Sequence, residues 1–198
     1  MRRNATDSTY QLTSKIWELG SHVIGRMDLI RAARPVMARL ADLTGETVHL
    51  SRLDGTEVVY VDRIESRHHI RAHMNVGARA PAIATAPGKA MLAHMQDDCL
   101  EGFRRHLKRC AGRPRTPLEE LRDGLELARQ QGYAAIPHDE GIAACASVIL
   151  DGHGKLAGAV GVSGPESRIK RRQLEQIAVY VTDAANSISA ELGYRRPD

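Results

Sequence analysis

The sequence predicts an α+β domain in which helices pack against an antiparallel sheet. Two observations carry this prediction. Apolar residues recur at helical spacing near both ends of the chain, and two stretches between them alternate like strands on either side of an Asp-Gly turn. Strands and helices come in separate groups, which is typical of α+β domains rather than of parallel α/β sheets.

The N-terminal part is predicted to form two helices. Residues 13–25 form the first, and residues 28–44 form the second, which Asp28 caps and Gly45 ends. Pro35 lies too deep in the second helix to be a first-turn proline. We therefore expect a kink or a restart of the helix at this position.

Strands are predicted after the second helix and again near the C-terminus. Residues 47–66 and 142–165 each form a hairpin around an Asp-Gly turn, and the later pair is apolar enough to be buried on both faces. Residues 68–81 are predicted to form another strand. The stretch 132–141 is rich in turn-forming residues and is predicted to be a loop.

Three further helices are predicted. In residues 84–95, Thr85 serves as N-cap and Pro87 suits the first turn. A capping box that begins at Thr116 starts a helix that runs to Gly132. The last helix carries an apolar stripe made of Leu174, Ile177, Val181, Ala184, Ile188 and Leu192.

Composition excludes several classes of protein. A chain of 198 residues that is 42% hydrophobic allows one substantial domain with an appendage. There is no run of eighteen apolar residues for a membrane span, and the basic start lacks the apolar segment of a signal peptide. Three scattered cysteines favour the reducing cytoplasm over a disulfide framework. The net charge of +4 lies within residues 1–40, and the rest of the chain is balanced.

The pair Gly88-Lys89 lies at the predicted start of a helix, where a phosphate-binding loop would end. That motif needs a glycine at the position of Ile83 and a hydroxyl at the position of Ala90, so a nucleotide site is excluded. Free backbone N–H groups at a helix start also attract carboxylates. An ordinary capped core helix explains the same residues, and both interpretations stay open on this segment alone.

Three stretches together resemble a known family. They are "GARAPAIATAPGKAMLAHM", "TPLEELRDGLELARQQGYA" and "ILDGHGKLAGAVGVSGPESRI", and their order is that of the C-terminal domains of IclR-family transcriptional regulators. The first contains a segment similar to the family's A-x-G-K-A pattern. In the third, Ser163-Gly164-Pro165 resembles the S-x-S-G-P that ends the family's last strand. The resemblance covers essentially residues 10–192.

The resemblance implies a GAF-like domain, with a curved antiparallel sheet, surrounding helices and a preceding linker helix. Residues 28–198 would be the effector-binding domain, and residues 1–27 a remnant of the winged-helix wing and the linker helix. It further implies a cytoplasmic homodimer or homotetramer that binds a small organic acid and is not an enzyme. Neither a cofactor nor a membrane is expected as a partner. DNA would be bound only through a winged-helix domain that is largely absent from these residues.

The positions of this sequence that match the family's ligand pocket are mostly glycine and alanine. Such residues leave volume for a ligand, while a few polar groups orient it; tight sheet packing would favour the same residues. The acidic loop of the family is shortened here, and its acids stand at Asp139 and Glu140. The resemblance assigns ligand contact to Gly77, Ala78, Ala84, Thr85, Ala86, Gly88, Asp139, Ile142, Ala144, Gly161 and Ser163.

An enzyme of the GAF-like class is the alternative function. Cys145, with His138 and Asp139 close in sequence, has the residue types of a thiol nucleophile and its base. A cysteine within "AACAS" on an apolar strand is more typical of a buried small hydrophobe. Strand alternation also points Cys145 and Ala144 to opposite faces of the sheet.

Two other kinds of site have weaker signals. The cluster of His68, His69 and His73 would need further ligands to hold zinc, and an exposed strand edge is the simpler interpretation. Basic residues near the N-terminus, such as Arg2 and Arg3, have the chemistry to touch phosphates. Without a reading helix such contacts give only weak, salt-sensitive binding to nucleic acid.

Overall fold

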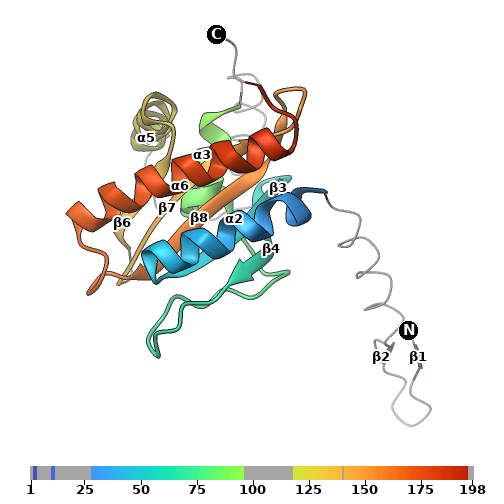
Figure 1. Ribbon diagram of the computed structural model, residues 1–198, viewed down its shortest axis with the longest axis horizontal. Coiled ribbons are helices and arrows are strands. Elements are labelled where there is room, and N and C mark those ends of the chain that lie inside the picture. The colour runs from blue at the N-terminus through green and yellow to red at the C-terminus, as the bar shows by residue number, and fades with distance from the viewer. Residues whose placement is uncertain (1, 4–9, 12–27, 96–117, 140, 196–198) are drawn as a thin grey trace.

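A six-stranded antiparallel sheet forms the centre of the protein in the computed structural model, which describes residues 2–3, 10–11, 28–95, 118–139 and 141–195 (Figure 1). The strand order is β5-β4-β3-β8-β7-β6. The bounds of these strands are β3 Thr47–Asp54, β4 Glu57–Ile64, β5 Arg79–Pro81, β6 Ala134–Asp139, β7 Ile142–Leu150 and β8 Leu156–Pro165. A separate two-stranded sheet pairs β1 (Arg2–Arg3) with β2 (Tyr10–Gln11).

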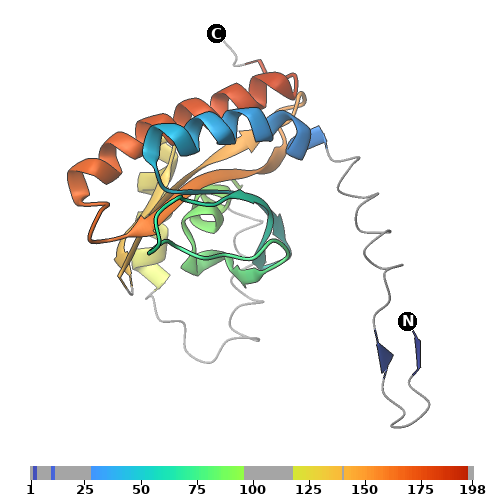
Figure 2. The ribbon, with the colours of Figure 1, turned by 60° about the horizontal axis from the view of Figure 1, so that its bottom comes forward.

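Helices cover both faces of the large sheet. The long helices α2 (Asp28–Thr44) and α6 (Arg171–Glu191) lie side by side on one face (Figure 2). The opposite face carries the short 3-10 helix η1 (Ala82–Ala84) and α3 (Ala86–Ala93), against which α5 (Leu118–Gln131) packs. Along the part of the chain that is described, no helix combines the length and apolarity needed to cross a bilayer.

Alternation along β3 divides its side chains between two interiors. Val48 and Leu50 belong to the core under α2 and α6. Residues between them in sequence point the other way, towards the interior shared with α3. In the pairing of β3 with β8, His49 lies opposite Gly161 and Thr47 lies opposite Ser163. The second interior is therefore lined from β3 by polar side chains.

Both predicted hairpins are confirmed, and so is the N-cap of α3. The β3–β4 hairpin turns at Gly55, which has a φ of 60°, and β7 pairs with β8 along its length. The Thr85 side chain accepts a hydrogen bond from the Gly88 N–H of α3. The segment 13–25 and the capping box at Thr116 lie outside the described residues.

Two strand predictions were wrong. Only Arg79–Pro81 of the segment 68–81 is a strand, which pairs with the edge of β4, while Gly77 and Ala78 before it hydrogen-bond to Tyr60 from a turn. The predicted loop 132–141 contains β6, whose Ala134 pairs with Ala146 of β7. A proline at position 137 is tolerated there because β6 is an edge strand whose register shifts after Ile136.

Of the kink or restart expected at Pro35, the restart does not occur: α2 continues as a single helix through this residue. A proline lacks the N–H that would bond the carbonyl four residues earlier, here that of Arg31. Pro35 lies on the exposed side of α2. Water can therefore take the place of the missing N–H, and the buried face holds the helix on the sheet.

Candidate functional site

The interior between the sheet and α3 contains two buried polar atoms without a hydrogen-bond partner. They are His49 Nδ1 on β3 and Ser163 Oγ on β8, and their residues are 1% and 2% exposed. Within the described residues, no other buried side-chain nitrogen or oxygen is unpartnered. Buried polar groups are nearly always hydrogen-bonded in native proteins, so two on one face of neighbouring strands indicate a place where a ligand or water completes the structure.

Strand pairing brings these two residues together. Ser163 lies opposite Thr47 on β3 and opposite Ala144 on β7, and His49 lies opposite Gly161. Directly paired residues of an antiparallel sheet share a face, so His49 and Ser163 are diagonal neighbours on the α3 side. The two strands come from distant parts of the chain, and their pairing creates the site.

His49 is held in an apolar surrounding. Its ring meets Tyr60 of β4 edge to face, with 5.4 Å between the ring centroids. Burial lowers the pKa of His49 to about 4, and burial raises the pKa of Tyr60 to about 12. Both side chains are therefore neutral near pH 7. A neutral imidazole offers one donor and one acceptor, which suits a ligand with hydroxyl or carboxyl groups.

The start of α3 is less open to an anion than the sequence suggested. Thr85 Oγ1 accepts the Gly88 N–H at 3.1 Å, and Thr85 O accepts the Lys89 N–H at 2.9 Å. Pro87 has no N–H to offer. Of the first-turn N–H groups, that of Ala86 takes part in neither of these bonds. A ligand at this place would therefore depend more on side chains than on backbone N–H groups of the helix.

Two of the glycines assigned to the pocket are needed for close packing. A Cβ atom at Gly88 would lie 2.1 Å from the carbonyl oxygen of Ala82, so α3 contacts η1 backbone to backbone. A Cβ atom at Gly161 would lie 2.6 Å from His49 Cε1. The space beside Gly161 therefore holds the imidazole of His49 rather than an empty volume.

The other predicted ligand contacts divide between the interior and the surface. Ala144 is half-buried beside Ser163, and Ala86 is buried on α3. Three more are exposed, namely Gly77, Ala84 and Ile142. The half-buried Ala78 hydrogen-bonds through its carbonyl to the Tyr60 N–H, at 3.1 Å. Asp139 pairs with Ile142 at the end of β6, but its side chain lies outside the described residues.

His49 and Tyr60 were missed by the sequence reasoning. The available signal was the alternation of β3, in which Thr47, His49 and Ser51 are polar at every second position. Such alternation is typical of a strand with one face in water, and it does not distinguish water from a polar interior. The structure shows that all three residues are buried.

Cys145 lies on the other face of the sheet. It is fully buried in the core under α2 and α6, and burial raises the pKa of its thiol to about 12. A protonated thiol is a poor nucleophile. The side chains of His138 and Asp139, its suggested partners, lie outside the described residues.

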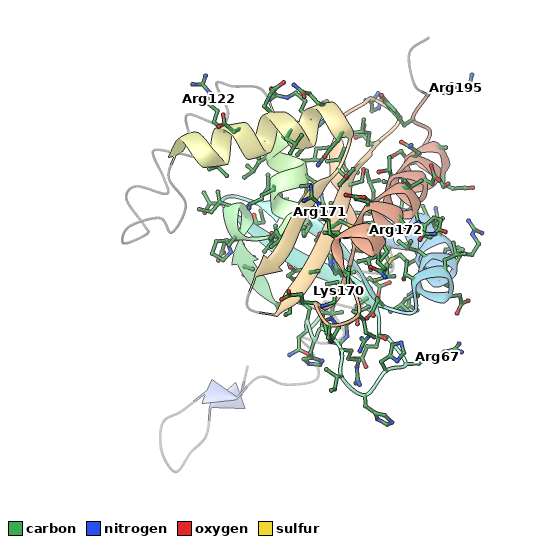
Figure 3. All side chains as sticks on the ribbon, turned by 90° about the vertical axis from the view of Figure 1, so that its left-hand side faces the viewer. Arg67, Arg122, Lys170, Arg171, Arg172 and Arg195 are labelled. Atoms are coloured by element: carbon green, nitrogen blue, oxygen red, sulfur yellow. The ribbon has the colours of Figure 1, made fainter. Side chains whose placement is uncertain are left out.

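The residues that the structure describes form no metal site. Within them, no group of three His, Cys, Asp or Glu side chains is placed to hold a metal ion, and His68, His69 and His73 are all exposed. Figure 3 labels six basic side chains, of which three lie together at the start of α6, one lies on α5, and two lie outside the helices and strands. These six are Arg67, Arg122, Lys170, Arg171, Arg172 and Arg195.

The chain is similar to bacterial regulators. Residues 21–190 match the family described as bacterial transcriptional regulator IclR C-terminal. The chain is 35% identical over 191 residues to the HTH-type transcriptional regulator KdgR of Escherichia coli K12, covering 93% of this chain and 72% of that protein. It is 33% identical over 189 residues to KdgR of Dickeya chrysanthemi, covering 93% of this chain and 62% of that protein.

Solved structures show the same fold. The crystal structure of the Thermotoga maritima IclR has a TM-score of 0.81 at 30% identity, and the match covers 97% of this chain and 79% of that one. The C-terminal domain of E. coli KdgR has a TM-score of 0.73 at 33% identity, covering 85% of this chain and 100% of that one.

Proposed function

We propose that this chain, which belongs to the IclR family of bacterial transcriptional regulators, senses a small organic acid in the interior between its sheet and α3. In this proposal residues 28–198 form the effector-binding domain. Residues 1–27 are the end of a winged-helix wing and the linker helix. The regulator acts in the cytoplasm as a homodimer or homotetramer.

The observation that carries the proposal is the pair of unpartnered atoms, His49 Nδ1 and Ser163 Oγ. Leaving a buried polar group without a hydrogen bond costs about 1–3 kcal/mol. A ligand that donates to or accepts from both groups would recover this free energy on binding. Apolar and small residues around them, such as Ala86 and Ala144, would enclose the rest of a small molecule.

Regulation would follow from linkage between effector and operator. An effector that binds one arrangement of the domain better than another shifts the population towards it. Because α2 begins directly after the proposed linker, a change in how α2 packs on the sheet would reach the DNA-binding part. The coupling is reciprocal, so operator DNA must change effector affinity by the same factor.

The test is a thermal-melt screen of the chain against small carboxylates and aromatic acids. A ligand at a hundred times its Kd adds about 2.7 kcal/mol of stability, which is a clear shift in Tm. Ser163→Ala removes the unpartnered oxygen and is expected to weaken or abolish a hit without destabilising the free protein.

The matched control for this screen is Ser147→Ala. Ser147 is also buried on the sheet, but its hydroxyl donates to the Gly132 carbonyl at 2.8 Å. This variant should lose stability and keep ligand binding. If a hit is equally strong in wild type and Ser163→Ala, the site lies elsewhere. If a broad panel yields no hit, effector sensing is contradicted, and oligomerisation becomes the better account of this domain.

A further inference from the structure

Among the described side chains, none offers a counter-charge to a protonated His49. On β4, Tyr60 packs against its ring and Arg63 lies opposite it in register. On β8, its neighbours are the uncharged Gly161 and Ser163. Among the described residues, no carboxylate points towards His49 from these strands.

The remaining charged groups on the packed elements are engaged elsewhere or lie further out. Arg63 donates to the Met74 carbonyl and to Asn75 Oδ1, and it pairs with Glu65. Asp62 lies opposite Leu50, on the other face, where it pairs with Arg34 of α2. These contacts give both charged groups partners other than the imidazole.

The other packed elements contribute little charge. α3 carries one charged residue, Lys89, which is half-exposed, and the residues that β7 places on this face, such as Ala144, Ala146 and Val148, are uncharged. Cys145 of β7 points into the other core. Among the side chains that the structure describes, the surroundings of His49 thus contain no anion that would stabilise an imidazolium.

We propose that His49 contacts the effector and takes up a proton from solution when an anionic effector binds beside it. This inference rests on the proposed function above. An incoming carboxylate would supply the counter-charge that the interior lacks, and it would also accept a hydrogen bond from the protonated ring. Ser163 would hold a second polar atom of the same ligand. Specificity for an acid, rather than for its amide or ester, would come from His49.

The coupling has a defined sign. In the free protein, burial lowers the pKa of His49 to about 4, so the ring is neutral above that pH. A bound carboxylate raises this pKa, because an opposite charge favours the charged form. Between the free and bound pKa values, each bound anion brings one proton, and Kd rises about tenfold for each unit increase in pH. Affinity therefore increases as the pH falls.

Proton uptake can be measured by titration calorimetry in two buffers that differ in ionisation enthalpy, at about pH 6, near the ordinary pKa of histidine. The probes are pyruvate, glycolate and benzoate, added to the whole chain. We expect the wild type to take up close to one proton per bound probe. His49→Asn keeps a hydrogen-bonding group near the Nδ1 position but cannot be protonated. It should bind without proton uptake, and its Kd should not vary with pH in this range.

His153→Gln is the matched control, because His153 is exposed in the turn between β7 and β8. Its proton uptake should equal that of the wild type. NMR of ring-labelled histidine follows His49 directly in the wild type, so the inference stays testable even where His49→Asn does not fold. The His49 signal should shift to the protonated position on adding a probe.

The possible results distinguish a failure of the role of His49 from a failure of the proposed function. Binding by the wild type without proton uptake, or uptake that persists in His49→Asn, would overturn the role of His49 alone. The effector site at Ser163 would then stand. If neither the three probes nor any acid of the broad panel binds to the wild type at any pH between about 5 and 8, a range that spans the ordinary pKa of histidine, the proposed function fails, and the role of His49 fails with it.

Discussion

The imidazole of His49 occupies the space that a side chain at Gly161 would need. A Cβ atom at position 161 would lie 2.6 Å from His49 Cε1, 2.8 Å from the Cys145 carbonyl oxygen and 2.9 Å from Ala146 Cβ. Gly161 stands where the family's S-x-S-G-P pattern has its first serine. The missing side chain at Gly161 of β8 therefore leaves room for the His49 ring of β3.

Gly161→Ala should destabilise the protein by about 2 kcal/mol, because overpacking a filled core costs about 1–3 kcal/mol. Urea denaturation measures the change in free energy of unfolding. In the double variant with His49→Ala, part of this loss should be recovered, since one of the three close contacts is removed. Full additivity of the two single effects would contradict a direct contact between these residues.

Burial of His49 predicts a pH dependence of stability. The folded-state pKa is about 4 and the ordinary value is 6.5, so between these values the unfolded chain binds a proton that the folded protein does not. Stability therefore falls as the pH decreases from 6.5 to about 4. His49 accounts for about 3 kcal/mol of this loss in the free energy of unfolding, as calculated from the difference between the two pKa values.

Comparing the wild type with His49→Asn isolates the contribution of His49 to the pH dependence of stability. The free energy of unfolding, measured by urea denaturation across this pH range, should fall more steeply in the wild type than in the variant. Parallel curves would show that His49 is protonated equally in the folded and unfolded states. The difference between the curves should level off above the ordinary pKa of histidine.

The ion pair between Glu46 and Arg168 should contribute strongly to stability. Glu46 Oε1 and Oε2 accept from Arg168 Nε and Nη2 at 2.6 and 2.8 Å, and the Glu46 side chain is only 5% exposed. Arg168→Ala leaves a buried carboxylate without its partner, at a cost of about 3 kcal/mol in the free energy of unfolding. Thermal or urea denaturation measures the loss.

Arg171→Ala is the matched control for that variant. Arg171 lies at the N-terminal end of α6 (Figure 3), and its pair with Glu175, at 3.6 Å, is exposed. Exposed pairs contribute little, so the expected change is within about 0.5 kcal/mol. Equal losses in the two variants would mean that burial of Glu46 is not the cause.

The N-cap of α3 provides a local test. Thr85→Ala removes the oxygen that accepts the Gly88 N–H and should cost about 1 kcal/mol of stability, whereas Thr85→Ser should cost little. Thr182→Ala serves as control, because the Thr182 hydroxyl only donates back to the Ala178 carbonyl within α6. A loss in Thr182→Ala as large as in Thr85→Ala would argue against capping as the cause.

Local signals in the sequence determined both hairpins and the described helices α2, α3, α5 and α6. The cap at Thr85 and the turn at Gly55 depend on groups only a few residues apart, so a short stretch of chain contains all the information. Family resemblance added the position of Ser163 within a pocket, although the sequence alone offered no reason for that hydroxyl to lack a partner.

Tertiary structure decided the rest. β6 is a strand only because β7 offers it an edge, and the polar face of β3 is buried because α3 and the segment around Ala72, whose carbonyl accepts the Thr47 hydroxyl, lie over it. The meeting of His49 with Gly161 and Ser163 depends on pairing between strands far apart in the chain. Periodicity within one segment cannot encode such a pairing, since the same alternation of residues suits a face in water and a face around a ligand.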